Sequence, residues 1–297
     1  MTDPTSSLLS RLVPVVFVLL WSTGYIGARM GAPWSEPLSF LTVRFGIVVI
    51  LMAIVAAVLR APWPQSRAAA FHAVVVGVLV HGCYLGGVFW GIDRGMPAGV
   101  AALIVGLQPL LTAFAAGPVL GEKIGAKEWI GLAIGLVGVS LVLAPKLNVA
   151  DAGISVGTIV PVLIGTVSIT LGTLYQKRFA TGIDLRTGAV LQYVGGVSVV
   201  GIGALIFENF EITWTTEFII ALAWLVLVLS IGAITLLMML IRKGAVSRVA
   251  SLFYLVPVLT ALVAWGLFGE TLNWIQIAGM AVTTVAVAVV ARAPKAG

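Results

Sequence analysis

The sequence has almost no cysteine and very little charge. Its single cysteine, Cys83, excludes an internal disulfide and leaves no thiol cluster for a metal. Charged residues make up 9% of the 297 positions and hydrophobic residues 60%, with a mean hydropathy of +1.14. A soluble domain of this length cannot hide so much apolar surface. The composition therefore indicates an integral membrane protein, for which we expect no metal, no cofactor and no nucleic-acid partner.

Acidic residues are missing from the interior of the apolar stretches, because all eleven aspartates and glutamates fall in loops or at stretch ends. Many ion-coupled carriers use a buried carboxylate, so coupling here would need histidine, backbone carbonyls or no ion at all. An intramembrane aspartyl protease needs paired aspartates and a metalloenzyme needs a ligand cluster, and the sequence shows neither. A serine facing His81 cannot be assigned from sequence. We expect a protein that is not an enzyme.

The apolar stretches are separated by charged residues or by proline and glycine. Most have about 20 residues, the length needed to cross about 30 Å of hydrocarbon. They predict ten membrane-spanning helices, over residues 12–30, 38–59, 69–91, 97–119, 129–144, 154–174, 187–207, 218–241, 247–268 and 273–291. The connections are short and leave no room for a soluble domain.

The basic residues give the expected orientation. With an even number of spans both termini lie on one side, and that side holds most of the lysines and arginines. They are Arg11, Arg60, Arg67, Lys123, Lys127, Lys177, Arg178, Arg186, Arg242, Lys243, Arg248, Arg292 and Lys295, against Arg29, Arg94 and Lys146 on the other side. This bias places both termini in the cytoplasm. We therefore expect a multi-pass protein of a bacterial-type inner membrane, surrounded by lipid.

An internal repeat divides the chain. Residues 107–122 read LQPLLTAFAAGPVLGE and residues 255–270 read LVPVLTALVAWGLFGE, with a constant offset of 148 (257 − 109 and 270 − 122). Five spans in each half is an odd number, so the second half must be inverted relative to the first. The predicted fold is an all-α polytopic membrane protein of two inverted five-helix repeats, at residues 8–148 and 154–292.

The repeat also pairs two prolines and two glutamates. Pro109 and Pro257 lie near the centres of the fourth and ninth spans, where each removes an N–H and bends its helix, as a hinge or as a static kink. Freed carbonyls at that depth are tolerated where they line a cavity. For Glu122 and Glu270 the expected role is structural, as a cap or dipole partner of the helix that follows each.

The doubled motif, the ten spans and the opening WSTGYIGARMG of residues 21–31 resemble the EamA family of the drug/metabolite transporter superfamily. Within it, the opening segment and HGCYLGGVFWGIDRG of residues 81–95 are similar to YddG-type aromatic amino-acid exporters. The resemblance implies secondary transporters that export metabolites, amino acids among them. It also implies a central cavity between spans 1, 3, 4, 6, 8 and 9, with spans 5 and 10 at the periphery.

Aromatic and polar residues on those spans are the candidate substrate contacts: Trp21, Tyr25, His81, Tyr84, Gln108, Tyr175 and Tyr254. Trp21 and Tyr25 are four residues apart on one helix face, and Tyr84 follows His81 by three. Together the rings could stack against a flat substrate. Taken alone, each of the aromatic residues fits a place in the helix core better than a contact with substrate.

The leading hypothesis is an inner-membrane secondary transporter that exports amino acids, aromatic ones preferred, or similar small metabolites by alternating access. An acid-free aromatic cavity also suits cation–π capture, so export of lipophilic or quaternary cationic drugs is the alternative. A passive channel is a further one, since alternating access cannot be read from sequence. The sequence is compatible with a monomer whose partners are a small-molecule substrate and the bilayer.

Overall fold

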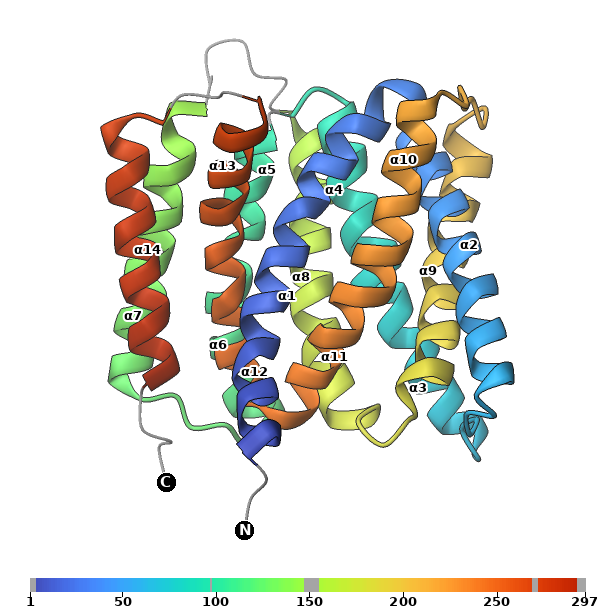
Figure 1. The fold of residues 1–297 in the computed structure, drawn as a ribbon, viewed down its shortest axis with the longest axis horizontal. Helices are drawn as coiled ribbons and strands as arrows, with labels where there is room; N and C mark the ends of the chain where they lie inside the picture. The colour runs from blue at the N-terminus through green and yellow to red at the C-terminus, as the bar shows by residue number, and fades with distance from the viewer. Residues whose placement is uncertain (1–3, 97, 147–154, 269–271, 293–297) are drawn as a thin grey trace.

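The chain folds into a bundle of helices that run roughly parallel to one another (Figure 1). A computed structural model describes residues 4–96, 98–146, 155–268 and 272–292. Within these ranges the strand-like structure is an isolated antiparallel bridge between Ser35 and Ile212. The start of α1 and the end of α14 lie at the same end of the bundle, drawn at the bottom of Figure 1. We call it the lower end, and the opposite one the upper end.

The helices of the first half are α1 (Pro4–Gly31), η1 (Ala32–Trp34), α2 (Pro37–Val58), α3 (Arg67–Gly77), η2 (Val78–Cys83), α4 (Tyr84–Asp93), α5 (Ala98–Val105), α6 (Gln108–Leu120), α7 (Ala126–Leu143) and η3 (Ala144–Lys146). Those of the second half are α8 (Val156–Phe179), α9 (Leu185–Phe207), α10 (Thr216–Trp224), η4 (Leu225–Ala233), α11 (Ile234–Lys243), α12 (Val246–Ser251), η5 (Leu252–Tyr254), α13 (Leu255–Phe268) and α14 (Trp274–Arg292).

Several neighbouring elements join into longer spans. In the described part of the chain nine runs are long and apolar enough to cross a membrane, and α1 contains a shorter apolar stretch, Leu12–Gly24. The nine are Pro37–Val58, Arg67–Asp93, Val100–Leu120, Ala126–Leu143, Val156–Phe179, Leu185–Phe207, Thr216–Lys243, Val246–Val263 and Trp274–Arg292. Their places agree with the apolar stretches of the sequence, whereas the total of ten and the side of the termini stay predictions.

Packing follows the twofold repeat. α7 packs along α14, and α2 along α9, so that two helices of each half pair with their own counterparts. α1 packs on α10, η4 and α13, which belong to the eighth and ninth spans, and its counterpart α8 packs on α3, η2, α4 and α6, which belong to the third and fourth. α1 begins at the lower end and α8 at the upper end (Figure 1). This opposite direction is what five spans per half require.

Helix breaks recur at matching places in the two halves. The third span contains a π-helical segment, η2, and the eighth span contains η4, which lies at the same position once the offset of 148 is applied. Between α5 and α6 the chain turns just before Pro109, and the 3₁₀ turn η5 comes just before Pro257. Both prolines therefore stand in the first turn of a helical segment, where the missing N–H costs least. Whether they act as hinges stays a prediction.

Candidate functional site

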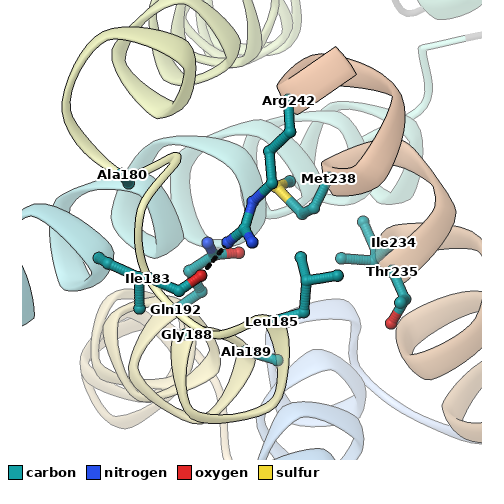
Figure 2. A pocket seen from close by; sticks show the side chains of 10 residues that line it. All are labelled: Ala180, Ile183, Leu185, Gly188, Ala189, Gln192, Ile234, Thr235, Met238 and Arg242. Atoms are coloured by element: carbon teal, nitrogen blue, oxygen red, sulfur yellow. Dashed lines mark hydrogen bonds between the residues drawn. The ribbon is translucent and has the colours of Figure 1, made fainter. Parts of the chain in front are cut away.

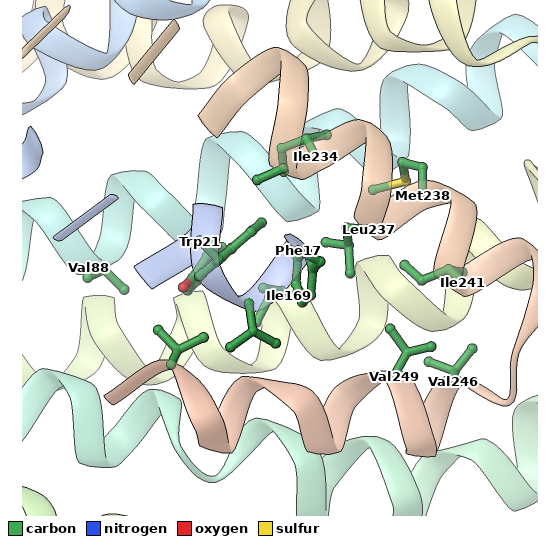
Figure 3. Packing of buried hydrophobic residues seen from close by; sticks show 14 of the residues in the cluster. Phe17, Trp21, Val88, Ile169, Ile234, Leu237, Met238, Ile241, Val246 and Val249 are labelled. Atoms are coloured by element: carbon green, nitrogen blue, oxygen red, sulfur yellow. The ribbon is translucent and has the colours of Figure 1, made fainter. Parts of the chain in front are cut away.

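A buried apolar cluster fills the middle of the bundle (Figure 3), and we call it the central cluster. It draws on the first, third, fourth, sixth, eighth and ninth spans, the arrangement that the family resemblance implied. Its buried members are Phe17, Val18, Trp21, Tyr84, Val88, Met96, Ala101, Ala116, Val162, Ile169, Leu174, Ala233, Ile234, Leu237, Met238, Ile241, Val246, Val249 and Val256. α2 and α9 share a second cluster, and α7 and α14 a third.

An aromatic trio lies within the central cluster. The ring of Trp21 is 5.3 Å from that of Phe17 and 5.1 Å from that of Phe253, which it meets edge to face at 84°. Phe17 and Phe253 are 5.5 Å apart. Such edge-to-face contacts stabilise an aromatic group and offer ring faces to a further flat group. Phe17 and Phe253 were not among the predicted residues, although Phe17 precedes Trp21 by four residues and so shares its face.

Gln108 brings an amide to the central spans. Gln108, Thr112 and Ala116 follow one another at intervals of four and therefore share one face of α6, and Ala116 belongs to the central cluster. The Gln108 amide donates to the Thr112 hydroxyl at 3.1 Å, while its Oε1 is buried and accepts no hydrogen bond in the described structure. A buried acceptor without a donor is costly, so this oxygen is available to a ligand N–H.

The side chains that the structure describes on the central spans bury no formal charge. Among the described residues the buried acids and bases, histidine aside, are Arg44 on α2 and Glu128 on α7, and neither helix contributes to the central cluster. Buried hydroxyls take the place of charges: Ser22 donates to the carbonyls of Val18 and Val256, and Thr260 donates to the Ser22 carbonyl. A substrate held here would meet hydroxyls, carbonyls, one amide and aromatic rings.

His81 does not share the helix face of Tyr84 that the sequence predicts for it. It is fully buried within η2, and its ring stacks on Tyr193 of α9 at 4.2 Å and 9°, with Phe45 of α2 at 5.9 Å. Tyr84 instead belongs to the central cluster. The expectation that both share a face is wrong, because the π-helical segment changes the angular spacing between them. A role for His81 on the pathway stays a prediction.

Arg44 and Tyr193 complete the surroundings of His81. Arg44 is 3% exposed, and its Nε donates to the Ser230 hydroxyl at 2.9 Å, so it does not extend to the membrane surface. Tyr193 donates its hydroxyl to the Ser230 carbonyl at 2.9 Å. Both contacts join α2 and α9 to the π-helical segment η4, which makes this region a structural junction between the second, seventh and eighth spans.

We expect Tyr193→Phe to lower the free energy of unfolding by about 1 kcal/mol, because it removes a buried hydrogen bond and keeps the ring stacked on His81. Thermal unfolding of the purified protein in detergent measures this. Ser198→Ala is the matched control on the same helix, since its hydroxyl is exposed and bonds only the Val194 carbonyl. A larger loss of stability in Ser198→Ala than in Tyr193→Phe would contradict the prediction.

The other predicted residues are spread over the bundle. Tyr175 bonds Nδ1 of His72 at 2.7 Å near the lower end of α8 and packs on Phe179. Tyr254 is 1% exposed and packs with residues of α6, α7 and α14. Tyr25 lies on α1, with its side chain outside the described part. The structure therefore places Trp21 and Tyr84 in the central cluster and Gln108 on the same face of α6 as a cluster member, whereas Tyr175, Tyr254 and His81 lie on central spans but pack away from the cluster.

A narrow pocket lies beside the central cluster, between α9, α11 and the segment that joins α8 to α9 (Figure 2), and it shares Ile234 and Met238 with that cluster. Arg242 points across it and donates to the Ile183 carbonyl. Nearby, the Arg186 side chain bonds the Asp184 carboxylate and lowers the pKa of Asp184 from 3.8 to about 2. The stability from this contact is present above pH 3.8 and lost only as pH falls through about 2, so Asp184 stays ionised near neutrality.

Comparisons with known proteins agree with the repeat. The model of the EamA-like transporter family matches residues 10–144 and again residues 157–292. The chain is 29% identical over 272 residues to the uncharacterized inner membrane transporter YedA of Escherichia coli, covering 92% of this chain and 87% of that protein. It is 27% identical to the uncharacterized transporter YvbV of Bacillus subtilis, covering 97% and 93%.

A more distant relative carries a functional name. The probable amino-acid metabolite efflux pump of Salmonella typhimurium is 24% identical over 276 residues, covering 89% of each chain. A solved crystal structure superposes with a TM-score of 0.76 at 19% identity and covers 94% of both chains. At that identity the likeness concerns the fold.

Proposed function

We propose, since the chain belongs to the EamA-like transporter family, that this multi-pass protein of the inner membrane exports amino acids, aromatic ones preferred, or similar small metabolites. The two halves, at residues 8–148 and 154–292, would contribute ten spans with both termini in the cytoplasm. They would work by alternating access, because inverted repeats can exchange conformations around one central site. The similarity to an amino-acid metabolite efflux pump supports the substrate class.

The observation that carries this proposal is an aromatic trio on spans whose described side chains bury no formal charge. Trp21, Phe17 and Phe253 offer ring faces, and Gln108 offers an unpartnered carbonyl oxygen that could accept from an ammonium group. A flat, net-neutral zwitterion matches both features, whereas a strongly anionic metabolite would find no buried cation among the side chains that the structure describes on these spans.

The proposal places Trp21, Tyr84 and Gln108 in contact with substrate, with Tyr25 as a further candidate on α1. The structure favours a supporting role for His81, Tyr175 and Tyr254, since each packs between helices away from the central cluster. Pro109 and Pro257 remain the proposed hinges, each next to a helix break at the corresponding place in its half.

Uptake into proteoliposomes tests the proposal. Labelled phenylalanine, labelled threonine and a quaternary dye are each offered with the others as competitors, with and without a pH gradient. Saturable phenylalanine uptake that the dye does not inhibit is expected. Dye uptake without amino-acid flux would instead support export of lipophilic cations, for which the acid-free aromatic centre is the favouring observation. Ion-like turnover without saturation would indicate a channel.

A further inference from the structure

The loop between α6 and α7 carries a carboxylate that binds the start of a helix in the other half. Glu122 accepts from the N–H of Val246 at 2.8 Å, from the Ser247 hydroxyl at 3.0 Å and from the Ser247 N–H at 3.4 Å. The first N–H groups of a helix lack intrahelical partners and form its positive end. Glu122 therefore caps α12, and the expectation that it caps the following helix is wrong.

A different glutamate, Glu128, caps the helix that follows this loop, α7, and it also contacts the other half of the chain. Glu128 accepts from the N–H of Gly125 at 3.0 Å and so closes the start of α7. Its other oxygen binds Nε of Arg248, on α12, at 2.9 Å, and the Glu128 side chain is only 4% exposed. Two carboxylates of the first half thus hold the same short helix of the second half at the lower end.

α12 has the properties of a movable segment. Its residues Val246 and Val249 belong to the central cluster (Figure 3), and α12 lies at the lower end of the bundle (Figure 1), so it covers the lower side of the proposed substrate region. The 3₁₀ turn η5 separates α12 from α13, shortly before Pro257. A break of this kind lets the two parts of a span reorient without unfolding either of them.

We propose that α12 is the gate at the lower end of the bundle, and that Glu122, assisted by the Glu128–Arg248 pair, latches it shut in the conformation described. This deepens the proposed function and rests on it, because alternating access requires one side to close while the other opens. Glu122 is half-buried, so its carboxylate can regain water when the bonds to Val246 and Ser247 break. Opening toward the lower end then requires loss of the three bonds.

Thiol labelling tests the latch without any substrate. In a Cys83→Ser background, Val249→Cys places one thiol on α12 within the central cluster, where the native side chain is 6% exposed. A membrane-impermeant maleimide is added from the lower side in oriented vesicles. Glu122→Gln is expected to raise the labelling rate at least about tenfold, because hydrogen bonds to a charged carboxylate are lost. Ser247→Ala removes one of them and is expected to raise the rate by a smaller factor.

Glu208 provides the matched control at the upper end. It accepts from the N–H groups of Leu38 and Ser39 at 2.8 and 2.7 Å, and from the Ser39 hydroxyl at 2.7 Å, so it too caps a helix of the other half. Its helix, α2, lies outside the central cluster. Glu208→Gln is therefore expected to leave labelling of Val249→Cys unchanged.

The outcomes separate the two proposals. Faster labelling in both the Glu122 and Ser247 variants, with no change in the Glu208 variant, supports the latch. Unchanged rates in the first two, or equal acceleration in all three, would overturn it. If the parent protein moves no amino acid while the labelling pattern holds, the substrate assignment fails and the latch stands. If uptake is saturable while labelling is unaffected, the latch fails and the transporter proposal stands.

Discussion

Replacing Gly77 with alanine is expected to lower the free energy of unfolding by about 3 kcal/mol, because there is no room for a methyl group. A Cβ at this position would lie 1.7 Å from the carbonyl oxygen of Gln192, and 2.5 Å or less from that residue's carbonyl carbon and Cα. These are backbone atoms of α9, so no rotamer change can move them aside. α3 and α9 would have to separate along the crossing that holds the third span against the seventh.

The same crossing depends on a second glycine from the other side. A Cβ at Gly195 of α9 would lie 2.3 Å from the carbonyl oxygen of Val74 on α3. Gly195→Ala should therefore also lower the free energy of unfolding. Gly46 of α2 is the control, since a Cβ there meets nothing within 4 Å. Gly46→Ala should be neutral or stabilising by up to about 1 kcal/mol.

Thermal unfolding of the purified proteins in detergent measures all three variants. A lower Tm for Gly77→Ala and Gly195→Ala, with Gly46→Ala at or above the parent, is the expected order. Equal Tm values for Gly77→Ala and Gly46→Ala would contradict the packing described. The close approach of backbones through small residues is the usual way in which helices associate in lipid, where hydrophobic burial gives little preference.

Much of the fold could be predicted because hydropathy and the repeat constrain it strongly. Spans of about 20 apolar residues are nearly obligatory helices in a membrane, and the offset of 148 relates one half to the other. The matching positions of η2 and η4, and of the turns before Pro109 and Pro257, extend that symmetry to the irregular parts. The π-helical segments themselves could not be predicted, since nothing in VLVHGC or LVLVLSIGA marks an extra residue per turn.

Less of the candidate site could be predicted, because helix rotation depends on neighbours far away in sequence. His81 and Tyr84 point to different neighbours once η2 is taken into account. Tyr254 packs toward α7 and α14 although it belongs to a central span, and a Cβ on Gly135 of α7 would lie 2.6 Å from its ring. The sequence predicts a local capping role for Glu122, whereas its partner Val246 is 124 residues away. Local spacing gives a helix face but not what that face contacts.

Trp21→Ala is expected to reduce kcat/KM for phenylalanine uptake at least tenfold if the aromatic trio binds the substrate ring. Stacking and apolar contact with one indole contribute about 2 kcal/mol together, which corresponds to roughly thirtyfold in a rate or binding constant. Trp21→Phe should keep most of the activity, since a smaller ring can still meet Phe17 and Phe253 edge to face. Initial uptake rates over a range of phenylalanine concentrations give both kinetic constants.

Stability must be separated from binding in this experiment, because Trp21 is only 8% exposed and its removal also leaves a cavity. Trp274→Ala is the control for a lost indole, since that side chain is 85% exposed at the start of α14. Rates are compared per folded transporter, counted by size-exclusion chromatography before reconstitution. A folded Trp21→Ala protein with unchanged uptake would show that the substrate passes elsewhere, and Gln108→Ala would then be expected to have no effect either. A loss confined to aromatic substrates, with threonine uptake retained, would instead place the ring of the substrate against the trio, because threonine has no ring to stack there.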